Sequence, residues 1–240
     1  MTIHPALAEI DLVVFDKDGT LISFDAMWAP WARSLGARLE AVTRRPVAGD
    51  VFAAIGFDPV DDRVRPGGPL AVDTMAGIEE RVAAVLRRWC PSVPAARRAL
   101  AEAWFEPDPV AEAVPLADLQ KLFGTLRGAD RLIAIATTDD RDATEATIAG
   151  LGLASFLSVV LCGDDDGPRK PQTAAFAAIC ERAGCSVGRS AMVGDTPADL
   201  RMARDAGAGL VVAVRSGVAS GTELEPLADV ILDSVADLAG

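Results

Sequence analysis

The sequence predicts an α/β protein with a doubly wound parallel sheet and an inserted all-helical domain. Short apolar runs rich in β-branched residues recur along the chain, as expected for buried strands. Most of these runs are followed by stretches with apolar residues at three-to-four spacing, which indicate amphipathic helices. This alternation is typical of an open parallel sheet with right-handed crossovers. The first and second runs, however, are separated by a segment too long for a strand-to-helix loop.

The predicted elements of the α/β part follow from these two patterns. Strands are predicted at residues 10–15, 132–136, 156–161, 190–193, 210–214 and 230–232. Helices are predicted at residues 116–127, 142–151, 173–183 and 197–206, which are rich in Ala, Leu, Arg and Glu.

The long segment at residues 22–115 has no alternating strand pattern and is predicted to be a separate helical domain. Its predicted helices span residues 25–39, 51–55, 72–89 and 93–105, and a Pro/Gly-rich stretch at 56–69 interrupts them. The predicted domains are therefore 1–21 with 116–240 for the α/β core, and 22–115 for the insert.

The composition of the chain excludes several classes of partner and chemistry. The chain of 240 residues has 23 Lys and Arg against 35 Asp and Glu, a net charge of −12 that disfavours nucleic acid and anionic lipid as partners. His4 is the single histidine, which excludes most Ser/His/Asp and His-zinc chemistry. The four cysteines form no CxxC pair, and no apolar run approaches the roughly 18 residues of a membrane span. We expect a cytoplasmic protein without a membrane anchor.

Polar residues follow each of the first four predicted strands. Ligands of open parallel sheets bind beyond these carboxyl ends, so the following groups are expected to converge: Asp16 to Thr20, Thr137 to Asp140, Asp164 to Pro171, and Gly194 to Asp199. Several carboxylates in one place repel one another unless a cation sits among them, and such oxygen donors suit Mg²⁺. A metal, a lysine and backbone amides facing a nucleophilic carboxylate indicate a phosphate ester as substrate.

These residues resemble the four signatures of the haloacid dehalogenase-like hydrolase superfamily. The resemblance rests on DKDGT at residues 16–20, Thr137 ending the second strand, Lys170-Pro171 after the third, and GDxxxD at 194–199. The short-chain phosphatases similar to phosphoglycolate phosphatase are the nearest comparison. The resemblance implies a Rossmann-like core with a helical cap that closes over the site.

The resemblance also implies a role for each matching residue. Asp16 would attack phosphorus and become an aspartyl-phosphate, and Asp18 would act as general acid and then as general base. The metal would be held by the carboxylates of Asp16 and Asp195 and by the backbone carbonyl of Asp18, with Asp199 in support.

The phosphoryl group is expected to be bound by Gly19, Thr137, Thr138 and Lys170, and Lys170 would also neutralise charge on Asp16. Thr138 and Asp139 depart from the family pattern, in which Asn and a basic residue are common. Lys17 is expected to point away from its two acidic neighbours by strand alternation and to be structural.

Simpler interpretations of the same residues exist. Asp-Gly is a common turn pair, Thr137 can bond its own backbone, Lys170 can be a solvated cation, and Asp195 with Asp199 can favour a helix N-terminus. Asp164 to Asp166 are expected to form a solvated loop rather than a second metal site.

Members of the superfamily that this sequence resembles catalyse several different reactions. An acid at Asp18 argues against a dehalogenase, and the only lysines are Lys17, Lys121 and Lys170, so the insert lacks the lysine that phosphonate-cleaving members need. Sugar-phosphate mutases related to this pattern carry a histidine after the first signature, which is missing here. We predict a Mg²⁺-dependent phosphatase of small phosphorylated metabolites, monomeric or homodimeric. A mutase, a non-catalytic phosphate-binding protein and a receiver-like signalling module are the alternatives.

Overall fold

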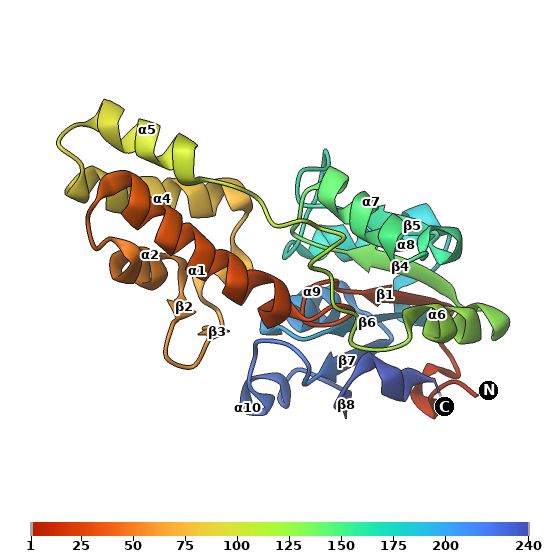
Figure 1. Cartoon of the computed structure of the whole chain (residues 1–240). Coiled ribbons are helices and arrows are strands. Elements are labelled where there is room, and N and C mark those ends of the chain that lie inside the picture. The colour runs from red at the N-terminus through yellow and green to blue at the C-terminus, as the bar shows by residue number, and fades with distance from the viewer. Residues whose placement is uncertain (1, 240) are drawn as a thin grey trace. The chain divides into compact units, whose positions relative to one another are not determined.

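The chain folds as two compact units, Met1–Phe24 with Pro109–Gly240 and, between them in sequence, Asp25–Asp108. The computed structural model describes residues 2–239. Figure 1 shows strands with helices on both sides in the first unit and mainly helices in the second. We call them the α/β unit and the helical unit.

The sheet of the α/β unit is parallel throughout, as predicted. Within residues 2–239 it contains six strands in the order β5-β4-β1-β6-β7-β8. The first strand, β1, lies in the middle, where Phe15 is in register with Ile135 of β4 and Val193 of β6. The strands are β1 (Leu12–Phe15), β4 (Leu132–Ala136), β5 (Val159–Leu161), β6 (Ser190–Gly194), β7 (Leu210–Val214) and β8 (Val230–Leu232). The carboxyl ends of β1, β4 and β6 are therefore neighbours.

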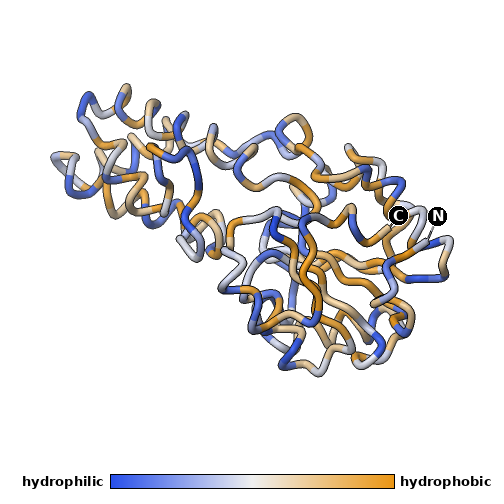
Figure 2. The backbone as a smooth tube through the Cα atoms, turned by 90° about the horizontal axis from the view of Figure 1, so that it is seen from below, coloured by the Kyte–Doolittle hydropathy of each residue, from blue (hydrophilic) through white to orange (hydrophobic). Residues whose placement is uncertain are grey.

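Helices cover both faces of this sheet because the strand residues alternate between two apolar clusters. Val13 and Phe15 pack with α6 (Leu119–Gly128) and α7 (Arg141–Gly150), whereas Leu12 and Val14 pack with α8 (Thr173–Ala183) and α9 (Pro197–Ala206). The short helix α10 (Gly221–Leu224) joins the second cluster through Leu224. Figure 2 shows the hydrophobic strands enclosed within the α/β unit. The predicted doubly wound architecture is confirmed.

One predicted strand is shorter than expected. The apolar pattern at 156–161 predicts a strand, but residues Ala154–Phe156 form a 3₁₀ turn and only Val159–Leu161 pair with β4. The reason is that Phe156 packs its ring against Phe123 of α6, with centroids 6.3 Å apart, and so belongs to the helix layer. An apolar run alone does not distinguish these two uses.

The two chain segments that connect the units run side by side within the α/β unit. The backbone N–H of Ser23 donates to the carbonyl of Val114 at 2.8 Å, and that of Leu116 donates to the carbonyl of Leu21 at 2.9 Å. A short bridge also pairs Ile22 with Pro115. The insertion is thus joined to the core through paired backbone.

The helical unit has its own aromatic core. Trp31 is 1% exposed, and its ring meets those of Trp28 and Trp104 edge-on at centroid distances of 5.5 and 5.6 Å. Its indole N–H donates to the carbonyl of Phe105 at 2.9 Å, which satisfies the polar end of the buried ring. The helices are α1 (Phe24–Thr43), α2 (Ala48–Ile55), α3 (Pro69–Val72), α4 (Met75–Trp89) and α5 (Val93–Ala103).

The prediction of an all-helical insert is wrong in one place. Within the Pro/Gly-rich stretch, β2 (Phe57–Asp58) and β3 (Arg63–Val64) form a two-stranded antiparallel hairpin. Gly56 ends α2 with φ +80°, and the Asp58 carboxylate accepts the backbone N–H of Val60 at 2.9 Å to fold the turn. Strands of two residues leave no alternating pattern that the sequence could show. Among residues 2–239, no helix is both long and apolar enough to cross a membrane.

Candidate active site

Three buried carboxylates meet where β1 and β6 end. Asp16 directly follows β1, and Asp195 directly follows β6, which is the neighbouring strand. The N–H of Asp16 donates to the carbonyl of Val193 at 2.9 Å, which continues the ladder to the site. Together with Asp199, these residues each offer a carboxylate oxygen, and the three oxygens lie within 4.8 Å of one another. All three residues are at most 6% exposed.

Lys170 joins two of these acids. The loop that follows β5 brings its ammonium into ion pairs with Asp16 and, at 2.6 Å, with Asp199. Its Nζ also donates to the carbonyl of Ala136, the last residue of β4, at 3.2 Å. The side chain of Lys170 is 6% exposed, so it is not the solvated surface cation of the alternative interpretation.

Asp199 occupies the first turn of α9 and has two partners. One oxygen accepts the hydroxyl of Thr196 at 2.6 Å and the Thr196 N–H at 3.3 Å, which forms a capping box at the helix start. The other oxygen pairs with Lys170. The helix-start role and the lysine contact therefore exist together in this residue.

Asp195 is oriented by residues of the first motif and by residues after β7 that the sequence does not predict. Its carboxylate accepts the Thr20 hydroxyl at 3.3 Å and the N–H of Val218 at 3.0 Å. Two glycines lie against it: a Cβ at Gly19 would come within 2.5 Å of the carboxylate, and one at Gly217 would overlap it. Thr20 stands in the quoted DKDGT motif, but the segment after β7 has no motif that would have drawn attention to it.

Burial and crowding govern the protonation of this cluster. Burial raises the pKa of Asp16 well above its ordinary value; Lys170 opposes this shift, whereas Asp199 and Asp195 add to it. Burial and then the charge of Asp199 raise the pKa of Asp195 to about 7. Burial alone would lower the pKa of Lys170, but attraction by Asp16 and Asp199 outweighs it and raises the pKa. The cluster therefore contains three carboxyl groups but only the one ammonium of Lys170.

The donor set fits a hard divalent cation. Three buried carboxylate oxygens within 4.8 Å of one another are the ligand type that such cations take in proteins, and one lysine does not neutralise them. Within residues 2–239, this is the one group of acidic, histidine or cysteine side chains close enough to hold a metal.

The Asp18 carboxylate is not one of these three oxygens, and the expectation for its neighbour Lys17 was wrong. The Lys17 ammonium contacts Asp18 at 2.7 Å and Asp139 at 2.9 Å instead of pointing away. Strand alternation does not apply because β1 ends at Phe15, and a turn carries residues 16–20. Burial raises the pKa of Asp18, with Lys17 opposing the shift.

The predicted phosphate-binding residues follow β4 and β1. Thr137 is 1% exposed, its N–H donates to the carbonyl of Leu161 at 2.9 Å, and its hydroxyl oxygen accepts the N–H of Asp139 at 3.1 Å. The carbonyl of Thr138 packs so closely on Gly163 that a Cβ there would overlap it. The N–H of Gly19 donates within its own turn to the carbonyl of Ile22 at 2.8 Å. The role of these residues toward phosphate stays a prediction.

The acidic loop after β5 has a structural role. The Asp165 carboxylate takes both the Nε and an Nη of Arg141 at 2.8 and 2.7 Å, and Asp164 accepts the Arg141 N–H at 2.8 Å. These contacts tie the loop to the start of α7.

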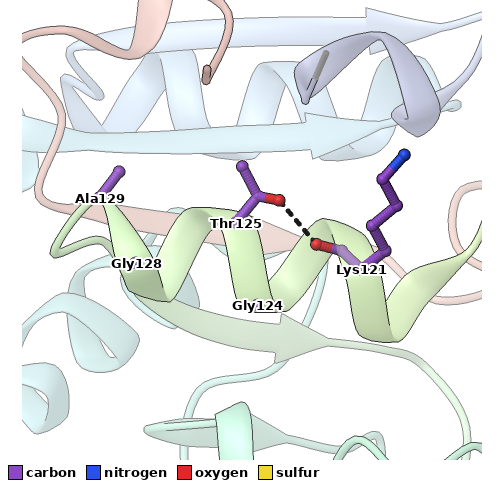
Figure 3. Close-up of a pocket in the computed structure, with 5 residues that line it drawn as sticks. All are labelled: Lys121, Gly124, Thr125, Gly128 and Ala129. Atoms are coloured by element: carbon purple, nitrogen blue, oxygen red, sulfur yellow. Dashed lines mark hydrogen bonds between the residues drawn. The ribbon is translucent and has the colours of Figure 1, made fainter. Parts of the chain in front are cut away.

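A separate hollow of about 410 Å³ lies along α6, away from all predicted site residues. It is lined by Lys121, Gly124, Thr125, Gly128 and Ala129 (Figure 3). The glycines have no side chains to fill it, and the Thr125 hydroxyl donates to the Lys121 carbonyl at 2.8 Å within the helix. None of the predicted site residues lines it.

The parallel sheet and the buried carboxylates at its edge define a doubly wound α/β protein with a candidate metal site, and comparison with known proteins gives the family. The chain belongs to the haloacid dehalogenase-like hydrolase family, whose model matches residues 10–207. The predicted membership of this family is confirmed, and so is the prediction that the chain is an enzyme of the phosphatase type.

Curated proteins and solved structures are similar to this chain. The chain is 29% identical over 213 residues to a phosphoglycolate phosphatase of Rhodospirillum rubrum, covering 83% of this chain and 78% of the relative. It is 25% identical to a phosphoglycolate phosphatase of Agrobacterium fabrum, covering 95% and 90%. A protein of Thermotoga maritima assigned as a beta-phosphoglucomutase shares the fold, with a TM-score of 0.64, 15% identity and coverage of 95% and 96%.

Proposed function

We propose that the chain is a Mg²⁺-dependent phosphatase that hydrolyses small phosphomonoester metabolites through an aspartyl-phosphate on Asp16. The observation that carries the proposal is the placement of Asp16, which directly follows β1 and lies beside both Lys170 and the acidic pair Asp195 and Asp199. The phosphoglycolate phosphatases among the relatives support a short phosphorylated acid as the class of substrate to test first.

In the first step, a carboxylate oxygen of Asp16 attacks phosphorus and forms the acyl-phosphate bond. The bond from phosphorus to the ester oxygen breaks, and its electron pair leaves with that oxygen. Asp18 donates a proton to the leaving oxygen, and burial, which raises the pKa of its carboxyl, favours the protonated form that this step needs. Lys170 offsets the negative charge that gathers around Asp16.

In the second step, water attacks phosphorus and the bond to Asp16 breaks. Asp18, now ionised, accepts the proton of that water, so both carboxyls return to their starting states when inorganic phosphate leaves. Thr137, Thr138 and the amides near Gly19 are proposed to bind the phosphoryl oxygens.

Mg²⁺ would be held by Asp16 and Asp195 with the backbone carbonyl of Asp18, and when bound it supplies positive charge that stabilises the phosphoryl oxygens. Asp199 would hold Lys170 in place through the 2.6 Å ion pair. The Asp195 carboxylate is already oriented without a bound cation, by hydrogen bonds from Thr20 and Val218 and by the two glycines that pack against it.

The helical unit is proposed to act as the cap, which selects the part of the substrate beyond the phosphoryl group. We further propose that the substrate is a free metabolite of the cytoplasm. The mutase alternative lacks the histidine expected after the first signature, since His4 precedes it.

The test is phosphate release from a panel of phosphomonoesters that includes phosphoglycolate, sugar phosphates and nucleoside monophosphates. We expect release in Mg²⁺ and none in EDTA. Transfer of the phosphoryl group within a sugar phosphate, without release, would instead establish the mutase. Absence of both from a folded, Mg²⁺-binding protein would favour a binding role.

A further inference from the structure

A buried lysine contacts the proposed proton-transfer residue. Lys17 lies between Asp16 and Asp18 in sequence, and its side chain is 3% exposed. Its Nζ lies 2.7 Å from Oδ2 and 2.9 Å from Oδ1 of Asp18, so one ammonium spans both oxygens of that carboxylate. Such contact on both oxygens restricts how the carboxylate can turn.

A second acid holds the lysine from the other side. Asp139 Oδ2 lies 2.9 Å from Lys17 Nζ, and its side chain is 23% exposed. The backbone of Asp139 is fixed in turn, because its N–H donates to the Thr137 hydroxyl oxygen at 3.1 Å and its carbonyl accepts the N–H of Gly163 at 2.8 Å. The lysine therefore has a rigid anchor on β4's side of the site.

The Lys17 ammonium has more than the one carboxylate partner that its burial requires. A buried ammonium requires a partner, and Asp139 provides one. The same ammonium also contacts Asp18, whose carboxyl must face the leaving oxygen in order to protonate it. The two acids come from segments that follow different strands, β1 and β4. The cation thus links the two loops that surround the proposed phosphoryl site.

We propose that Lys17, anchored by Asp139, is a positioning residue that holds the Asp18 carboxyl in the orientation from which it transfers protons. The inference rests on the proposed function. When Asp18 is protonated, one oxygen still accepts from Lys17, which leaves the protonated oxygen free to face the ester. Loss of this contact would let Asp18 turn away while Asp16 and the acid cluster stay in place.

The experiment compares two substrates by kcat/KM, which reports on steps up to departure of the leaving group. An alkyl ester such as phosphoglycolate needs a proton on the leaving oxygen, whereas 4-nitrophenyl phosphate has a leaving group stable without one. We expect Lys17→Met to lower kcat/KM for the alkyl ester about 30-fold and that for the aryl ester less than about 3-fold, as for a misplaced rather than deleted group.

Three further variants separate positioning from stability. Lys17→Arg keeps a cation beside Asp18 and Asp139 and should retain more of the alkyl-ester activity than Lys17→Met. Asp139→Asn should give a smaller loss with the same substrate preference, and combining it with Lys17→Met should lower activity no further than Lys17→Met alone. Lys121→Met, which changes an exposed lysine on α6, is the matched control and should leave both substrates unaffected.

Equal loss for the two esters, or additive effects of Lys17→Met and Asp139→Asn, would overturn the inference while leaving the proposed function intact. If Lys17→Met fails to fold, the substrate preference of Asp139→Asn decides between the two outcomes. Failure of the wild-type protein to hydrolyse either ester in Mg²⁺ would overturn the proposed function and the inference with it.

Discussion

The two units differ in their ion pairs, because the α/β unit has buried pairs in addition to exposed ones such as Arg204 with Asp229. In the helical unit, ion pairs such as Arg33 with Asp62 and Arg88 with Asp50 involve arginines that are 47% and 66% exposed. In the α/β unit, the ammonium groups of Lys17 and Lys170 are 3% and 6% exposed, and each contacts two carboxylates.

This difference shows where electrostatic free energy is concentrated. Exposed pairs are screened by water and contribute about 0–1 kcal/mol each. Buried charges interact strongly, and they are costly to leave unpaired. A protein keeps such an arrangement where chemistry requires it, so the acid-rich edge of the sheet is the place to test for function. The helical unit instead gains stability from its buried tryptophans.

The largest effect is expected from Asp16→Asn. The amide cannot act as the nucleophile, so turnover should fall by at least about 10⁴-fold, as when a nucleophile is deleted elsewhere. Asp50→Asn in the helical unit is the matched control and should change turnover less than about 3-fold. Steady-state phosphate release measures both, and similar losses would break the contrast between the units.

Asp18→Asn should lower turnover of an alkyl phosphate by at least about 100-fold because proton transfer in both steps is lost. The variant should still bind Mg²⁺, since the backbone carbonyl rather than the carboxylate is the proposed ligand at this position. Phosphate release and Mg²⁺ titration check the two statements. A loss below tenfold would remove the acid-base role of Asp18.

Lys170→Met should destabilise the fold by about 3 kcal/mol without added metal, because Asp16 and Asp199 would lose their shared cation inside the protein. Arg88→Met, which removes an exposed pair of the helical unit, should change stability by less than about 1 kcal/mol. Urea unfolding compares the two. Equal effects would show that burial does not distinguish these ion pairs.

The smallest effect is stabilisation by metal. Mg²⁺ at about 100 times its dissociation constant should add about 2.7 kcal/mol to the stability of the α/β unit. The thermal midpoint of the wild-type protein should rise with Mg²⁺, whereas that of Asp195→Asn should respond far less. A rise of the same size in both proteins would place the ion elsewhere.

The sequence predicts the α/β architecture because buried parallel strands and amphipathic helices leave strong patterns. It also predicts which acids meet, since Asp16 and Asp195 follow strands that prove to be neighbours. It does not predict the β2–β3 hairpin, whose strands are two residues each.

The sequence also does not predict the contacts made by local turns and loops. The direction of the Lys17 side chain depends on the irregular segment that follows β1. The orientation of Asp195 depends on Val218 and Gly217, which belong to the segment after β7. Such contacts depend on how turns and loops bring segments together, which residue identity alone does not reveal.

The most direct test of the central claim is to look for the phosphoryl group on Asp16. The enzyme would be mixed with Mg²⁺ and 4-nitrophenyl phosphate, quenched in acid during turnover, digested and analysed by mass spectrometry. We predict that the peptide containing Asp16 gains the mass of one phosphoryl group and that Asp16→Asn shows no such gain. Turnover with the phosphoryl group on another residue would contradict the account.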